Sequence, residues 1–324
     1  ADNNTAVGYA SLGANTTGAS NVAVGGASLD ANTTGANNVA VGYASLGSNT
    51  TASNNTAVGV GAMDSNTTGA SNVALGANAL DANTTASNNT AVGFDALTAN
   101  TTGSLNVAIG ALAGDAITTG AAHTLIGYNA GSAITTADAI TAVGKDALEA
   151  NTSGQNVAFG ANALATVTTG TQNTAIGHDG LTVNTGNNNT SVGYQALAAN
   201  TTGIQNVAVG ALSLDANTTG ERNVAVGVGS LGSNTEGIRN TAVGDGAAAT
   251  NTTGIQLTAL GRLALNSNTT GSSNTALGEY ALAVNTTASN NVAVGNSALG
   301  ANTTGASNTA VGANALTANT TGTA

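Results

Sequence analysis

Apolar and polar positions recur along the chain with a fixed period of 17 residues. The pentapeptide Asn-Thr-Ala-Val-Gly at 4–8 returns at 21–25 as Asn-Val-Ala-Val-Gly and, with small changes, nineteen times in all, ending at 308–312. The spacing shortens to 16 residues only after the copies that begin at 140 and 173. A fixed short period is typical of a solenoid. The first residue of each pentapeptide is called position 1, and each coil is named by the number of that residue, so coil 21 begins at Asn21.

Positions 2 to 5 of each coil predict a short strand followed by a turn. Position 2 is always Thr or Val, position 4 is always apolar, and position 3 is Ala except at Leu125 and Ser191. Alternation with period two places positions 2 and 4 on one face of the strand and Ala on the other. Position 5 is Gly in every copy, which indicates a backbone conformation that only Gly tolerates.

Positions 9 and 12, usually Leu and Asn, vary together in two coils. Coil 106 has Gly114 and Ile117 at these positions, and coil 123 has Gly131 and Ile134. A lost large apolar residue is matched by one gained three places on, so both positions are expected to face the same core with its volume conserved. The usual Asn at position 12 is then expected to form a buried ladder, its amide bonding to the Asn one coil away.

These patterns predict an all-β fold, a β-solenoid of the β-roll type with about 19 coils of 17 residues and two short strands per coil. The absence of a compositional break predicts a single domain over 1–324. Neither end shows an atypical capping repeat, although solenoids normally need one. An uncapped end would expose unpaired backbone groups. Either the chain is cut from a longer array, or subunits stack end to end into a fibre.

The composition argues against several classes of partner and site. The chain has 15 acidic and only four basic residues, with a net charge of −11, which argues against a nucleic-acid partner. No apolar run is long enough to span a bilayer. There is no Cys, and His123 and His178 occupy different positions of the repeat, so no metal site is expected. No catalytic constellation or cofactor motif occurs in a supporting context. We therefore predict that the chain is not an enzyme.

Two columns of residues are candidates for partner contacts. Position 6 varies most and is expected to be exposed, so its aromatic residues form a possible contact strip, although scattered surface aromatics are the simpler explanation. These residues are Tyr9, Tyr43, Phe94, Tyr128 and Tyr194. Asp245, Arg262 and Glu279 follow one another in the same column and are expected to form a ladder of ion pairs.

The Ala column at position 3 is the second candidate. Its flat, apolar surface predicts an interface, either across the coil or between chains, with Ala74, Ala91 and Ala108 as representatives. The Asn-Thr-Thr tracts also match the acceptor pattern for N-glycosylation many times. A glycan on these Asn residues is incompatible with a buried ladder.

The pentapeptides resemble the head repeats of YadA-like trimeric autotransporter adhesins, and arrays of Asn-Thr-Ala-Val-Gly resemble those of some phage tail fibres. The resemblance implies a left-handed β-roll, a secreted, cell-surface or virion location, and often trimers. The Asn-x-Val-x-Gly pattern also resembles the ice-binding β-rolls of grasses.

The sequence thus predicts a non-enzymatic extracellular structural fibre subunit or adhesin-like rod that associates with itself, end to end or as a trimer, with a host surface or glycan as a possible partner. The alternatives are an ice-binding solenoid and a phage tail-fibre shaft. For ice binding, stacked Thr residues such as Thr16 and Thr17 could present a lattice, yet adjacent residues of a strand point to opposite faces.

Overall fold

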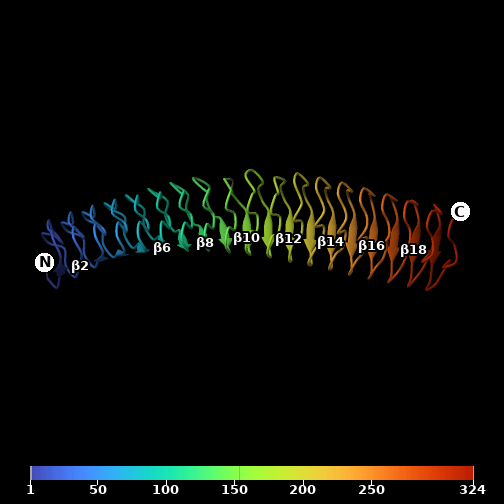
Figure 1. Ribbon diagram of the computed structural model, residues 1–324, viewed down its shortest axis with the longest axis horizontal. Helices are drawn as coiled ribbons and strands as arrows, with labels where there is room; N and C mark the ends of the chain where they lie inside the picture. Colours follow the sequence, from blue (N-terminus) through green and yellow to red (C-terminus); the bar gives the residue numbers. More distant parts are fainter. Residues whose placement is uncertain (1, 153, 324) are drawn as a thin grey trace. The chain divides into compact units, whose positions relative to one another are not determined.

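A computed structural model describes residues 2–152 and 154–323. Over these residues the chain is an all-β solenoid of parallel strands about 17 residues apart, with no helix. The coils group into two compact units, Ala1–Ala161 and Asn162–Ala324. Within each unit, successive coils stack so that their strands lie side by side (Figure 1). The single domain expected from the sequence stays a prediction.

Each described coil contributes one strand of three residues, positions 2 to 4. The first unit contains β1 (Thr5–Val7), β2 (Val22–Val24), β3 (Val39–Val41), β4 (Thr56–Val58), β5 (Val73–Leu75), β6 (Thr90–Val92), β7 (Val107–Ile109), β8 (Thr124–Ile126), β9 (Thr141–Val143) and β10 (Val157–Phe159). The second contains β11 (Thr174–Ile176), β12 (Thr190–Val192), β13 (Val207–Val209), β14 (Val224–Val226), β15 (Thr241–Val243), β16 (Thr258–Leu260), β17 (Thr275–Leu277), β18 (Val292–Val294) and β19 (Thr309–Val311).

The register of the strands stacks each residue on its counterpart one coil away. In β2 and β3, for example, Val22 pairs with Val39 and Ala23 with Ala40. The pairing of β9 with β10 keeps this register although coil 140 is one residue shorter. The missing residue is therefore absorbed outside the strand. Like residues stack on like, as the period predicts.

The prediction of two strands per coil is wrong. The side of the coil opposite the strand is a run of turns, because alternate residues there adopt left-handed backbone conformations, such as Ala27 (φ 55°) and Leu29 (φ 49°). The N–H of Asn32 donates to the carbonyl of Leu29 (3.2 Å), which closes one such turn. Bonds between coils continue here, as from Leu29 N to Ser45 O (3.0 Å). Extended strands need φ near −120°, which these residues do not have.

The invariant Gly at position 5 is required for steric reasons, as the sequence predicts. Gly42 has φ 140°, and a Cβ atom there would lie 2.3 Å from the carbonyl oxygen of Gly59 in the next coil. Because that obstacle is backbone, a side chain could not be accommodated by a rotamer change. The close stacking of neighbouring coils at this corner therefore requires Gly.

The core of each coil is narrow and consists of small residues and Asn. Positions 1, 3, 8, 9, 12 and 15 are buried, as in coil 21 with Asn21, Ala23, Ser28, Leu29 and Asn32. Positions 2 and 4 point outward and are half-buried or exposed in every described strand. The strand therefore turns its Ala inward and its β-branched residues toward solvent.

Candidate functional site

The Asn at position 1 joins consecutive coils from inside. The backbone N–H of Asn38 donates to Oδ1 of Asn21 (2.9 Å), and Nδ2 of Asn38 donates to the carbonyl of Ala52 in its own coil (2.9 Å). Both partners lie in the interior, where an unpaired amide would be costly. The same pattern recurs along both units. This ladder was not predicted from the sequence.

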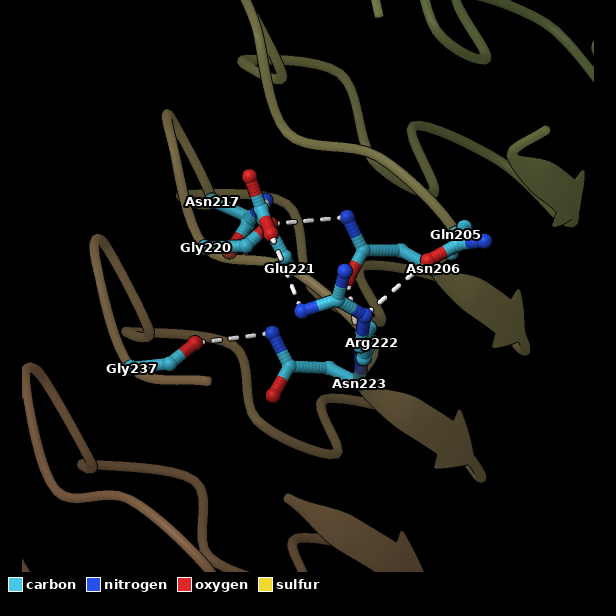
Figure 2. A network of polar contacts seen from close by, with 8 residues as sticks. All are labelled: Gln205, Asn206, Asn217, Gly220, Glu221, Arg222, Asn223 and Gly237. Carbon is cyan, nitrogen blue, oxygen red and sulfur yellow. Dashed lines mark hydrogen bonds and ion pairs between the residues drawn. The ribbon is translucent and has the colours of Figure 1, made fainter. Parts of the chain in front are cut away.

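The Asn at position 12 forms the second ladder, which the sequence did predict. Nδ2 of Asn49 donates to Oδ1 of Asn32 (2.9 Å) and to the carbonyl of Ala52 (3.1 Å). One carbonyl thus accepts amide hydrogens from both Asn residues of its coil. Figure 2 shows the same arrangement in the second unit, where Nδ2 of Asn206 and of Asn217 both donate to the carbonyl of Gly220.

These contacts exclude a glycan at position 12 of the interior coils. In Asn49, as in Asn66 and Asn217, the side-chain amide is fully buried and both of its amide hydrogens are engaged. A sugar attached to Nδ2 would replace one of these hydrogens and would have to fill a packed interior. The Asn-Thr-Thr tracts with a fully buried Asn therefore cannot carry glycans in the folded chain, whereas Asn15 in the first coil is half-buried.

Both ladders are interrupted in coils 106 to 140. Ile117 and Ile134 replace Asn at position 12, and His123 and Ile140 replace Asn at position 1. A Cβ atom at Gly114 would lie 2.9 Å from Cδ1 of Ile117, so the Ile side chain occupies the space that Leu fills elsewhere. The exchange of volume inferred from the sequence is therefore confirmed. Because Ile117 has no side-chain amide, Oδ1 of Asn100 in the preceding coil is buried without a donor.

The outward strand face consists of positions 2, 4 and 6. It presents Thr and Val, then Val, Leu, Ile or Phe, then the variable column. Its apolar residues are exposed to an unusual degree in both units, at Val7, Val60, Leu75, Ile109, Phe159, Ile176, Val228 and Val311. In the first unit the only charged residue on this face is Lys145. Continuous exposed apolar surface marks sites of contact with another surface.

The aromatic residues proposed as a contact strip lie on this outward strand face and are exposed. Tyr9 is 90 % exposed and Tyr43 is 65 % exposed, and Phe94, Tyr128 and Tyr194 are each about half exposed. Small residues, Val60, Lys145 and His178 separate them along the column, so they form a broken strip. The sequence placed this column correctly on the surface; its contact with a partner stays a prediction.

The Ala column lies on the inner face of the strand. Ala74, Ala91 and Ala108 have no exposed surface (0 %). Of the two alternatives that the sequence left open, an interface across the coil agrees with this placement, and an interface between chains does not. The physical reason is space: where position 9 is Leu, only a small side chain fits between the strand and the opposite turns, whereas Leu125 fits beside Gly114 and Gly131.

The charged residues of position 6 form the expected ladder in the second unit. The guanidinium of Arg262 lies 3.1 Å from Oε1 of Glu279 and 3.8 Å from Oδ2 of Asp245. It also donates to the hydroxyl of Tyr280 (2.9 Å). A second exposed network, drawn in Figure 2, joins Arg222 to Gln205 and Glu221 at the edge of the coil. Exposed pairs of this kind contribute little stability.

The two histidines have different surroundings. The ring of His178 stacks on that of Tyr194 at 5.8 Å, and its Nδ1 lies 2.9 Å from Oδ2 of Asp179 on the surface. His123 is buried in the position-1 ladder. Among residues 2–152 and 154–323 no three His, Cys, Asp or Glu side chains gather into a metal-binding group, and no pocket opens. The same residues contain no apolar helix of membrane-spanning length.

A comparison with models of protein families gives no match to this chain, and a comparison with curated proteins gives none either. The resemblance to adhesin heads and tail fibres therefore stays a prediction from the repeated pentapeptides.

Proposed function

We propose that the chain is a non-enzymatic structural element of an extracellular fibre or adhesin-like rod, in which copies associate laterally through the outward strand face. The observation that carries this proposal is the exposed apolar surface of positions 2, 4 and 6, which runs from coil to coil in each unit. A second copy presents the same regularly spaced surface, which in the first unit carries one charged residue, Lys145, and could cover it.

The size of this face suits a second copy. Ten strands spaced about 4.8 Å apart and three outward positions about 6.6 Å apart give the first unit a face of roughly 45 Å by 15 Å. Its area is thus on the order of 700 Å², close to the roughly 800 Å² that each partner buries in stable complexes. Because like residues repeat along the axis, association can begin in several registers, which favours bundles and fibres.

Two substitutions on this face test the proposal. Leu75→Lys with Ile109→Lys places two charges on residues that are 47 % and 40 % exposed. We expect sedimentation velocity to show oligomers for the wild-type chain and monomers for this variant, because a lysine buried at an apolar contact is costly. The matched control, Thr85→Lys with Thr119→Lys, changes exposed position-14 residues of the same coils and should associate like wild type.

Electron micrographs of the same samples separate the modes of association. Bundles of rods lying side by side support the lateral contact, and single thin filaments support the end-to-end stacking predicted from the sequence. A wild-type chain that remains a monodisperse monomer at high concentration contradicts the fibre proposal. The extracellular location and a host surface or glycan partner rest on the resemblance alone and are proposals of the same kind.

Ice binding is a second candidate, and the strand geometry favours it more than the sequence suggested. The Thr-Thr tract cannot supply a double rank, because the hydroxyl of Thr33 is engaged with the carbonyl of Thr50 (3.0 Å) while Thr34 alone is exposed. Positions 2 and 4, however, form two parallel outward ranks of mostly β-branched residues. A thermal-hysteresis measurement on the monomeric chain decides this candidate, and its absence removes it.

A further inference from the structure

One buried ionisable side chain lies inside a ladder that is otherwise built from neutral amides. His123 occupies position 1 of its coil and is 1 % exposed. Its backbone N–H donates to Oδ1 of Asn106 (3.0 Å), as the Asn of a regular coil does. Its ring Nδ1 accepts the backbone N–H of Ile140 (3.2 Å). The ladder therefore requires a neutral imidazole with Nδ1 unprotonated.

The other side of the imidazole offers little compensation for a positive charge. Nε2 is buried without a side-chain partner, and the backbone carbonyl of Ala137 in the same coil is a weak acceptor for the ring. The next coil begins with Ile140, where a regular coil has Asn, and the position-12 residues of coils 106 and 123 are Ile117 and Ile134. The carboxylate that acts electrostatically on the ring is that of Asp138, which lies at the exposed edge of the coil and accepts the N–H of Ala121 (2.8 Å).

We propose that coils 106, 123 and 140 form an acid-sensitive joint, which opens locally when the imidazole of His123 takes up a proton. Protonation at Nδ1 removes the acceptor of the Ile140 N–H. The new Nδ1–H of the ring then points at that N–H, and the two donors repel each other. It also places a charge in an apolar interior, which is strongly unfavourable. Opening of the coil lets the charged ring reach water, so protonation and opening are coupled.

The sign of this coupling follows from the direction of the pKa shift. Burial lowers the pKa of His123 from its ordinary value of 6.5, against the smaller raising effects of a backbone hydrogen bond at Ala137 and of the Asp138 charge. The opened coil therefore binds the proton more readily than the folded one. The joint keeps its full stability above pH 6.5 and loses it progressively as the pH falls from there toward the lowered pKa.

Hydrogen–deuterium exchange of the full-length chain between pH 7.5 and pH 5.0 tests the joint directly. After correction for intrinsic exchange, we expect amides of coils 106 to 140 in the wild-type chain to exchange faster at pH 5.0, by up to about thirtyfold. That limit applies because pH 5.0 lies about 1.5 pH units below the ordinary histidine pKa and each unit is a factor of ten. Coils 21 to 72 should show no such acceleration.

Three variants identify His123 as the cause. His123→Asn restores the regular ladder residue, in the same context as Asn240, whose Oδ1 accepts the N–H of Leu257 (2.9 Å). His123→Leu places at position 1 the residue that coil 257 already tolerates there. Both should fold and show exchange independent of pH. His178→Asn removes the exposed histidine and should behave like wild type.

The joint is disproved by either of two results. The first is a wild-type chain whose coils 106 to 140 exchange at the same corrected rate at both pH values. The second is an acceleration that survives in both His123 variants, which would assign it to another group such as Asp138. Loss of the acceleration in His123→Asn and His123→Leu, with its retention in His178→Asn, establishes the joint.

Discussion

Coils 21 to 89 and coils 106 to 140 belong to the same unit and share the same strand, yet they fill their interiors in different ways. The first group holds its coils together with two columns of Asn amides. The second replaces most of these amides with Ile and His and closes the space with Leu125. Strand register continues through both groups. The backbone ladder is therefore enough to set the fold, and the interior side chains decide how strongly each coil is held.

The largest effect should come from breaking the amide ladder in the regular coils. In Asn66→Ala, Asn49 Oδ1 loses its donor and Asn83 Nδ2 loses one of its two acceptors. Unpaired buried groups cost about 1–3 kcal/mol each, so we expect local stability to fall by about 4 kcal/mol. Native-state hydrogen exchange measures this per coil. Thr34→Ala, at an exposed position 14, is the control and should change it by less than about 0.5 kcal/mol.

The interrupted coils should depend on apolar packing instead. Leu125 is fully buried, and its Cδ1 lies 2.7 Å from where a Cβ of Gly114 would be. Leu125→Ala leaves a cavity between two glycine-containing coils and should cost about 3 kcal/mol. Leu105→Ala, at a residue that is 60 % exposed, should leave the melting temperature unchanged. Equal effects of the two substitutions would show that coils 106 and 123 are not packed around Leu125.

Moving the histidine into a regular context sharpens the comparison. Asn240→His places an imidazole between Asn223, which accepts the N–H of residue 240 (2.9 Å), and the N–H of Leu257. The variant should gain acid-sensitive exchange in coils 223 to 257, up to about thirtyfold at pH 5.0, for the reason given for His123. A variant that folds at pH 7.5 and keeps pH-independent exchange there would mean that a buried imidazole is not sufficient.

The smallest effect concerns acidic residues of the regular coils, where acid should act in the opposite direction. Burial, followed by the charges of Asp64 and Asp95, raises the pKa of Asp81 above its ordinary value. The folded state therefore binds the proton more tightly than the unfolded state, and stability rises as the pH falls from neutral through the raised pKa. Asp81→Asn should stabilise coil 72 at pH 7 by less than about 0.5 kcal/mol. A loss of stability at pH 7, measured by hydrogen exchange, would contradict this sign.

Much of this architecture can be predicted from the repeat. The period predicts the stacking of coils, and the invariant Gly predicts the corner at position 5. In coil 106, Gly114 replaces the usual Leu and Ile117 replaces the usual Asn, which shows that positions 9 and 12 share a core. Alternation alone could not show which face of the strand points into the coil, because both faces are apolar. Size held the missing signal: position 3 is nearly always Ala, whereas position 4 accepts Leu75 and Phe159. In a narrow coil the small, uniform residue must be the inner one.

The ladder at position 1 and the single strand per coil could not be predicted for a different reason. Asn at position 1 precedes a strand and is equally suited to a turn. Its role depends on the carbonyl of position 15, which is fourteen residues away and comes close only in the folded coil. The opposite side of the coil consists of turns because residues such as Leu29 adopt positive φ, which is rare for Leu and carries no sequence signal.

The central claim is that Asn side chains at positions 1 and 12 form buried ladders along the coil axis. Side-chain amide exchange, observed by NMR on chains with isotope-labelled Asn, tests it most directly. The account predicts slow exchange of the Nδ2 hydrogens of Asn49 and Asn55, which are buried and bonded, and fast exchange for the exposed Asn37 and Asn54. Uniformly fast exchange of all Asn side chains in the folded protein would contradict it.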